Sequence, residues 1–96
     1  MIIPKQIKFL GHIVKVTEVK EIDKKDTDGE YNLYEYTILL KKDNPQTVKE
    51  SVLFHEIAEM LTAYLCMNFE EVNGHKGFSR YMDLFWAILK ENDLIK

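Results

Sequence analysis

One histidine and two glutamates stand close together in the segment Ser51–Met60. His55 is followed directly by Glu56 and, four residues after His55, by Glu59. Residues four apart on a helix are neighbours on its surface, so His55 and Glu59 can reach one metal ion. Glu56 is turned by about 100° from His55, so it would not be a ligand but could lean over a bound water. This is the logic of His-Glu-x-x-His metallohydrolase helices, with a carboxylate replacing the second imidazole.

The surroundings of this His-Glu-x-x-Glu motif favour a buried helix. Apolar residues precede it at 52–54 and follow it at Ile57 and Ala58, and buried charge needs a partner or a metal. A third ligand is available in His75, sixteen residues after Glu59, if the two helices form an antiparallel hairpin. On the residues alone, a metal site and an ordinary His-Glu pair both stay open.

A small sheet is predicted before the motif. Alternating residues at Lys5–Phe9, a β-branched stretch to about Lys20 and the segment Leu33–Lys41 predict three strands. Asp23–Glu30 is interpreted as a charged turn, because Asp28-Gly29 is typical of a hairpin.

Two helices are predicted after the sheet. The first runs from Pro45 to about Met67, with Asn44 as its N-cap, and the second runs from about Lys76 to Asn92. The predicted fold class is therefore α+β, a small antiparallel sheet of about three strands followed by two helices, in a single domain over residues 1–96.

Composition narrows the classes of protein. The chain has 96 residues, of which 46% are hydrophobic and 30% charged, and a formal net charge of −3. No apolar run approaches the ~18 residues of a membrane helix, and no basic block favours nucleic acid. The lone Cys66 makes no intramolecular disulfide, so a cytoplasmic location is expected. The oligomeric state is not predicted.

Three segments resemble the small zincin-like metallopeptidase-type proteins of bacteriophages and mobile elements, over nearly the whole chain. Pro4–His12 is similar to their opening PK-x-I-x-I/F-L-G-H, and Ser51–Met60 to their s-x-l-x-H-E-I/V/L-x-E-x-I/L helix. His75–Phe78 with Leu84–Asn92 is similar to their closing H-x-x-I/F … L-Y/F-x-x-V/I/L-L-x-D/E-N. A commoner branch of these proteins has His-Glu-x-x-His and a later acidic ligand. This chain resembles that branch with Glu and His exchanged, so the ligand set is still two imidazoles and one carboxylate.

The resemblance implies a zinc site and a reaction. It assigns His55, Glu59 and His75 as ligands of Zn²⁺ and Glu56 as the catalytic carboxylate. Zinc accepts imidazole nitrogen and carboxylate oxygen, and catalytic sites keep an open position for water. Glu56 would accept the proton of that water as the hydroxide attacks a carbonyl. The implied protein is a zinc-dependent hydrolase of peptide or amide bonds, in the cytoplasm of the host cell if it is phage-encoded.

The resemblance also implies a substrate position, and two alternatives to the hydrolase stay open. By the same resemblance, a peptide or protein substrate is expected along an edge strand at 33–41. The first alternative is a metal-stabilised phage accessory module that binds a host protein without catalysis, although Glu56 favours the enzyme. The second is a metal-free domain in which His55, Glu59 and His75 form a polar cluster. Candidates for an oxyanion stabiliser, by residue type, are His12, Arg80 and Tyr34.

Overall fold

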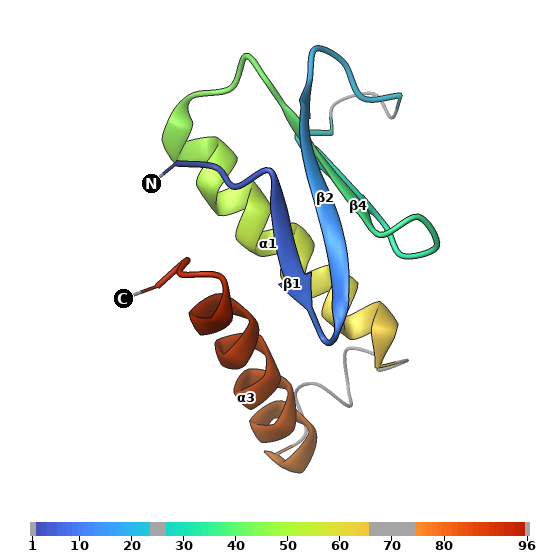
Figure 1. Ribbon diagram of the computed structural model, residues 1–96, viewed down its shortest axis with the longest axis vertical. Helices are drawn as coiled ribbons and strands as arrows, with labels where there is room; N and C mark the ends of the chain where they lie inside the picture. Colours follow the sequence, from blue (N-terminus) through green and yellow to red (C-terminus); the bar gives the residue numbers. More distant parts are fainter. Residues whose placement is uncertain (1, 24–26, 66–74, 96) are drawn as a thin grey trace.

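Within the part of the chain that the structure describes, four strands and two helices build the fold (Figure 1). The computed structural model describes residues 2–23, 27–65 and 75–95, without the side chains of residues 75–78. The elements are β1 (Gln6–Phe9), β2 (His12–Val19), β3 (Gly29–Asn32), β4 (Thr37–Lys41), α1 (Gln46–Tyr64) and α3 (His75–Glu91). The α+β class predicted from the sequence is confirmed. No helix of the described residues combines the length and apolar character needed to cross a membrane.

The sheet has the strand order β1-β2-β4-β3. β1 pairs antiparallel with β2 and β3 pairs antiparallel with β4, whereas the central pair β2 and β4 is parallel. The sheet is therefore two hairpins joined side by side. Among the described residues the sheet has four strands, one more than the approximate number expected, because the segment interpreted as a turn ends in β3.

Each hairpin has its own turn chemistry. Leu10 and Gly11 have φ of 47° and 88°, the two positive values that a tight β-hairpin turn requires. In the second hairpin, the backbone N–H of Glu35 donates to Asn32 Oδ1 at 3.0 Å, and Tyr36 has a φ of 53°. The turn therefore occupies 33–36, and the strand predicted from Leu33 begins only at Thr37.

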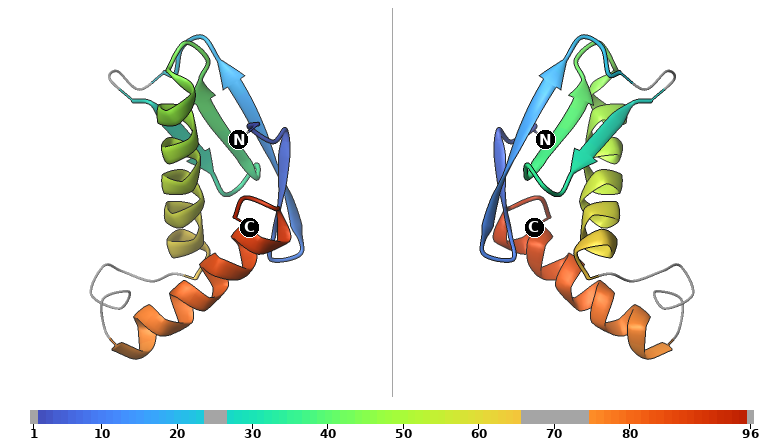
Figure 2. Two further views of the ribbon diagram at one scale, coloured as in Figure 1. Left: turned by 90° about the vertical axis from the view of Figure 1, so that its left-hand side faces the viewer. Right: turned by 90° about the vertical axis from the view of Figure 1, so that its right-hand side faces the viewer.

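The core lies between one face of the sheet and the two helices. α1 contacts β3 and β4, while α3 contacts α1 and β1, and Figure 2 shows α3 approaching the sheet at the β1–β2 hairpin. Alternate strand residues enter one cluster with the apolar side of α1. Its buried members include Ile7, Phe9, Val14, Val16, Ile38, Leu40, Leu53, Ile57, Met60 and Leu61.

The start of α1 differs from the prediction by one position. Pro45 occupies the N-cap, without a side-chain capping bond, and the helix begins at Gln46. Asn44 was expected to cap the helix, but its Nδ2 donates to Asp28 Oδ1 at 3.1 Å. The amide thus ties the start of α1 to the segment that leads into β3. The predicted end of the helix at Met67 lies outside the described residues.

Asn92 occupies the outer edge of β1. Its Oδ1 accepts a hydrogen bond from the Lys8 backbone N–H at 2.6 Å, and its Nδ2 donates to the Lys8 carbonyl at 2.8 Å. The same Nδ2 donates to the Ile88 carbonyl at 2.8 Å. The amide thus pairs with β1 as a neighbouring strand would, so an added strand cannot use this part of the edge. β3 forms the other edge of the sheet.

We expect Asn92→Ala to lower the free energy of unfolding by about 1.5–4.5 kcal/mol, because three hydrogen bonds worth about 0.5–1.5 kcal/mol each are lost. Urea unfolding followed by circular dichroism measures the change. Glu91→Ala is the control, since Glu91 is an exposed neighbour at the end of α3. Equal destabilisation by the two substitutions would contradict the role given to Asn92.

Candidate functional site

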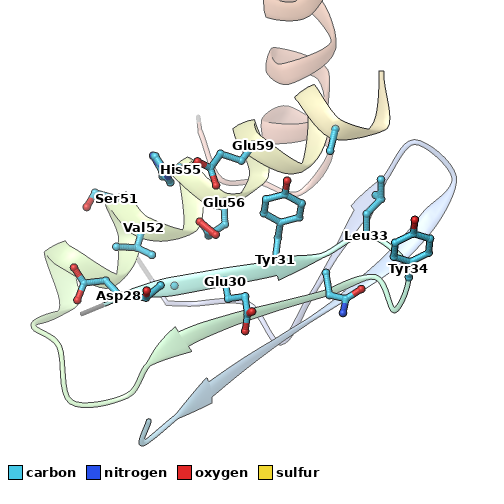
Figure 3. A pocket seen from close by; sticks show the side chains of 14 residues that line it. Asp28, Glu30, Tyr31, Leu33, Tyr34, Ser51, Val52, His55, Glu56 and Glu59 are labelled. Carbon is cyan, nitrogen blue, oxygen red and sulfur yellow. Dashed lines mark hydrogen bonds and ion pairs between the residues drawn. The ribbon is translucent and has the colours of Figure 1, made fainter. Parts of the chain in front are cut away.

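An open groove of about 1270 Å³ lies between α1 and the β3 edge of the sheet (Figure 3). Residues 27–34 line it from β3 and its flanks, and α1 contributes Ser51, Val52, His55, Glu56 and Glu59. The described residues that line the groove include four carboxylates and one histidine, and none of them is a lysine or arginine. The groove is therefore suited to a cation.

His55, Glu56 and Glu59 meet on the groove side of α1. His55 Nε2 lies 3.0 Å from Glu59 Oε1, as expected for residues one helical turn apart. One ligand atom from each of the three residues can be chosen so that all lie within 4.8 Å of one another. The spacing in the sequence thus produces a compact group of one imidazole and two carboxylates.

The three side chains differ in their access to solvent. His55 and Glu59 are exposed, with 66% and 49% of their side-chain surface accessible, so the burial expected for the motif is not found at these two residues. Glu56 is buried, with 4% of its residue surface accessible. Glu56 points down toward β3 (Figure 3). The two exposed groups can turn toward an ion at the mouth of the groove, while Glu56 forms part of the floor.

Gly29 makes room for the buried carboxylate. A Cβ built on Gly29 would overlap Val52 Cγ1 and would lie 3.2 Å from Glu56 Cγ and 3.3 Å from the Leu39 carbonyl oxygen. The absent side chain therefore lets α1 approach the backbone of β3 at the turn that carries Glu56. This role of Gly29 is not visible in the sequence, because Asp28-Gly29 is also a common hairpin dipeptide.

We expect Gly29→Ala to lower the free energy of unfolding by about 1–3 kcal/mol, the usual cost of overpacking. Adding Val52→Ala should recover part of this loss, because Val52 Cγ1 is the nearest obstacle. In thermal or urea unfolding, Gly11→Ala is the control: Gly11 has a φ of 88° and open space around it, so Val52→Ala should give it no relief. Absence of coupling between positions 29 and 52 would contradict the packing argument.

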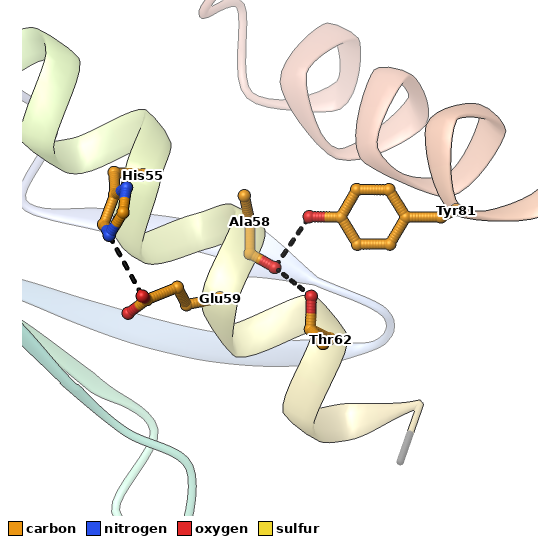
Figure 4. Close-up of polar contacts among 5 residues, drawn as sticks. All are labelled: His55, Ala58, Glu59, Thr62 and Tyr81. Atoms are coloured by element: carbon orange, nitrogen blue, oxygen red, sulfur yellow. Dashed lines mark hydrogen bonds and ion pairs between the residues drawn. The ribbon is translucent and has the colours of Figure 1, made fainter. Parts of the chain in front are cut away.

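α3 is joined to α1 beside the motif. The Tyr81 hydroxyl donates to the Ala58 carbonyl at 2.7 Å, and Thr62 Oγ1 donates to the same oxygen at 3.0 Å (Figure 4). Burial raises the pKa of Tyr81, and the charge of Glu59 adds to the rise while the Thr62 hydrogen bond opposes it. Tyr81 therefore stays protonated at neutral pH and remains a donor to the residue preceding Glu59.

His75, the third predicted ligand, begins α3. Its side chain lies outside the described part of the structure, so its approach to His55 and Glu59 stays a prediction. Tyr81, six residues later on the same helix, is the described contact that brings α3 to α1.

The predicted substrate strand requires a correction. β4 is hydrogen-bonded on both sides, to β2 and to β3, so 37–41 offers no edge, and 33–36 is a turn. The edge strand beside the motif is β3, Gly29–Asn32. The prediction misplaced the strand because four residues with a glycine carry too little alternation to be identified as one.

The three residues suggested as oxyanion stabilisers lie in different places. His12 stacks on Tyr36, with ring centroids 4.4 Å apart, and does not line the groove. Arg80 is exposed on α3 and is also absent from the groove lining. Tyr34 does line the groove, at the tip of the β3–β4 turn, where it is 99% exposed. The phenol inside the groove is that of Tyr31, a residue that no motif in the sequence marks.

Comparison of the chain with known protein families, with curated proteins and with solved structures gave no match. The assignment of a function therefore depends on the chemistry of these residues and on the arrangement of the groove.

Proposed function

We propose that this chain is a zinc-dependent hydrolase of the zincin type that cleaves peptide or amide bonds. His55 and Glu59 hold the ion together with His75, and Glu56 is the general base. One observation supports this above all: an imidazole and two carboxylates converge within 4.8 Å on one helix, at an open groove bordered by an edge strand.

The separation of the two described ligands suits zinc. Zinc binds imidazole nitrogen and carboxylate oxygen at about 2.0–2.2 Å, so two ligands of a tetrahedral ion lie about 3.4 Å apart. His55 Nε2 and Glu59 Oε1 are 3.0 Å apart, which requires only a small movement of two exposed side chains. A third protein ligand leaves the fourth position for water, as in catalytic zinc sites.

The burial of Glu56 favours the role of base over that of ligand. A carboxylate on the floor of the groove is held in place by its packing over Gly29, and Figure 3 shows it directed below the His55–Glu59 pair. A base in this position can take a proton from water held at the mouth of the groove. The hydroxide then attacks the carbonyl of a substrate in the groove.

The backbone of β3 can hold an extended substrate. The Asp28 carbonyl accepts a hydrogen bond from the Lys41 N–H at 3.2 Å, so alternate residues of β3 turn their backbone groups toward β4. Gly29 and Tyr31 are the residues in between, and their N–H and C=O groups point outward. A peptide can add there as a further strand and bring its scissile bond beside α1. The expected substrate position thus moves from 33–41 to β3.

One observation favours a metal-free alternative. The 3.0 Å contact between His55 and Glu59 is also a complete ion pair when His55 is protonated, so the group can be a polar cluster without an ion. The other alternative is a binding module without catalysis, which would have the same zinc site as the hydrolase.

Measurements of zinc content and peptide cleavage distinguish the hydrolase, the binding module and the metal-free polar cluster. Untagged protein is dialysed against zinc, its metal is counted by mass spectrometry, and the loaded protein is incubated with a random peptide library. We expect wild type to bind one zinc per chain and to cleave library peptides. The His55→Ala, Glu59→Gln double variant should lose the zinc. Zinc without cleavage would support the binding module, and no zinc would support the polar cluster.

A further inference from the structure

We infer that Tyr31 is the oxyanion-stabilising residue of this site, donating the hydrogen of its phenolic hydroxyl to the carbonyl oxygen of the scissile bond. The inference rests on the proposed hydrolase function and adds a catalytic residue to it. It concerns a side chain on β3, whereas the predicted ligands and base come from the helices.

The register of the sheet fixes the side on which Tyr31 lies. Tyr31 stands opposite Ile38 of β4, and the Ile38 side chain is fully buried beneath the helices. Gly29, two residues before Tyr31, faces Val52 and Glu56 of α1. Since alternate residues of a strand share a face, the Tyr31 ring must rise on the side of α1.

The ring is held and its hydroxyl is directed into the groove. Tyr31 is half-buried and packs against the hydrophobic core, so its orientation is restricted. Figure 3 shows the ring standing between β3 and α1, with the hydroxyl at its upper end on the side of Glu59. A substrate backbone paired with β3 would pass beside this hydroxyl on its way to the motif.

The other side-chain donors of the groove are less suitable. The Ser51 hydroxyl donates to the Val48 carbonyl at 3.0 Å. Asn32 follows Tyr31 directly and therefore lies on the opposite face of the strand. Tyr34 is almost fully exposed at the turn. None of the described lining residues is a lysine or arginine, and Tyr31 is better placed than Ser51, Asn32 and Tyr34 to donate to a developing negative charge.

The proposed step balances without a proton leaving Tyr31. Glu56 takes one proton from water, and the hydroxide oxygen forms a bond to the carbonyl carbon. The π electron pair of the carbonyl moves onto its oxygen, which accepts the O–H···O⁻ hydrogen bond from Tyr31. When the tetrahedral intermediate collapses, the carbonyl re-forms, the C–N bond breaks and the proton held by Glu56 passes to the leaving nitrogen. Donors of this kind stabilise the transition state more than the ground state.

The test compares zinc-loaded wild type, Tyr31→Phe and Tyr64→Phe on a peptide that wild type cleaves in the library screen. Tyr31→Phe should lower kcat by about 10²–10³-fold, the usual effect of removing one oxyanion donor, with little change in KM. Tyr64→Phe, which removes a phenolic hydroxyl at the end of α1 and outside the groove lining, should leave kcat unchanged. As a readout that does not depend on turnover, a phosphinic analogue of the same peptide should bind Tyr31→Phe more weakly than wild type by calorimetry. The amide peptide itself should bind equally to Glu56→Gln and to the Tyr31→Phe, Glu56→Gln double variant. Glu56→Gln is present in both proteins so that the peptide is not cleaved during the measurement.

Each other outcome overturns the inference in a recognisable way. If wild type cleaves the peptide and Tyr31→Phe has the same kcat and the same affinity for the phosphinic analogue, the hydrolase stands and Tyr31 has no such role. If Tyr31→Phe loses zinc, Tyr31 is a metal ligand and not a donor. If wild type binds zinc but cleaves no peptide, the proposed function fails first, and the role of Tyr31 fails with it.

Discussion

Glu56→Gln should leave zinc bound and lower the rate of peptide cleavage by about 10²–10⁴-fold, the usual effect of removing a general base. Glutamine has the size of glutamate, so the packing of residue 56 over Gly29 is kept. The amide can still hydrogen-bond a water molecule, but it cannot accept its proton. The measurements are kcat/KM on a library-derived peptide and zinc affinity by competition with a chromogenic chelator.

Glu59→Gln is the matched comparison and should give the opposite result. Glu59 is exposed and lies 3.0 Å from His55 Nε2, so the substitution replaces an anionic ligand by a neutral amide on the same helix face. Zinc affinity should fall first, and activity should fall with it and recover in excess zinc. If Glu56→Gln loses the metal while Glu59→Gln keeps it, the roles of the two glutamates are reversed.

Zinc should also stabilise the fold. An ion that binds only the folded chain at a free concentration 100 times its Kd adds about 2.7 kcal/mol. For a domain of this size, about 4–8 °C in Tm corresponds to each kcal/mol, so the expected rise is about 11–22 °C. Differential scanning calorimetry with added zinc and with EDTA measures it.

The control for this stabilisation is the His55→Ala, Glu59→Gln double variant. Both residues lie on the exposed side of α1, so the variant should fold and its Tm should be the same with zinc and with EDTA. A wild-type Tm that is the same with zinc and with EDTA would contradict the metal site. An equal rise in the variant would assign the zinc to other residues.

Local spacing accounts for what the sequence predicts well. The i, i+4 relation of His55 and Glu59 depends only on helical geometry, and the structure places His55 Nε2 3.0 Å from Glu59 Oε1. The two helices were likewise predicted close to their observed positions. The dipeptide Asn44-Pro45 marks the start of α1, and α3 shows a 3.6-residue period over many residues. The α+β class follows from the order of these patterns along the chain.

Contacts between distant segments account for what the sequence left out. The parallel pairing of β2 with β4 depends on the packing of whole hairpins, and no local signal marks it. Gly29 has a hairpin sequence but a packing role, and Tyr31 looks like any strand aromatic until its neighbours are known. The moved substrate edge and the oxyanion donor both follow from β3, whose four residues carry almost no periodic signal.

The contact between Asn92 and Lys8 joins groups 84 positions apart in the sequence. At a synthesis rate of about 5–20 residues per second, the ribosome needs about 4–17 s to make the intervening chain. During that time the β1–β2 hairpin, whose contacts are local, can form with its outer edge uncovered. Lys5 and Lys8 place positive charge along this edge, a feature that discourages pairing between strands of different chains. The positive charges thus oppose aggregation of the nascent hairpin until Asn92 has been synthesised and pairs with Lys8.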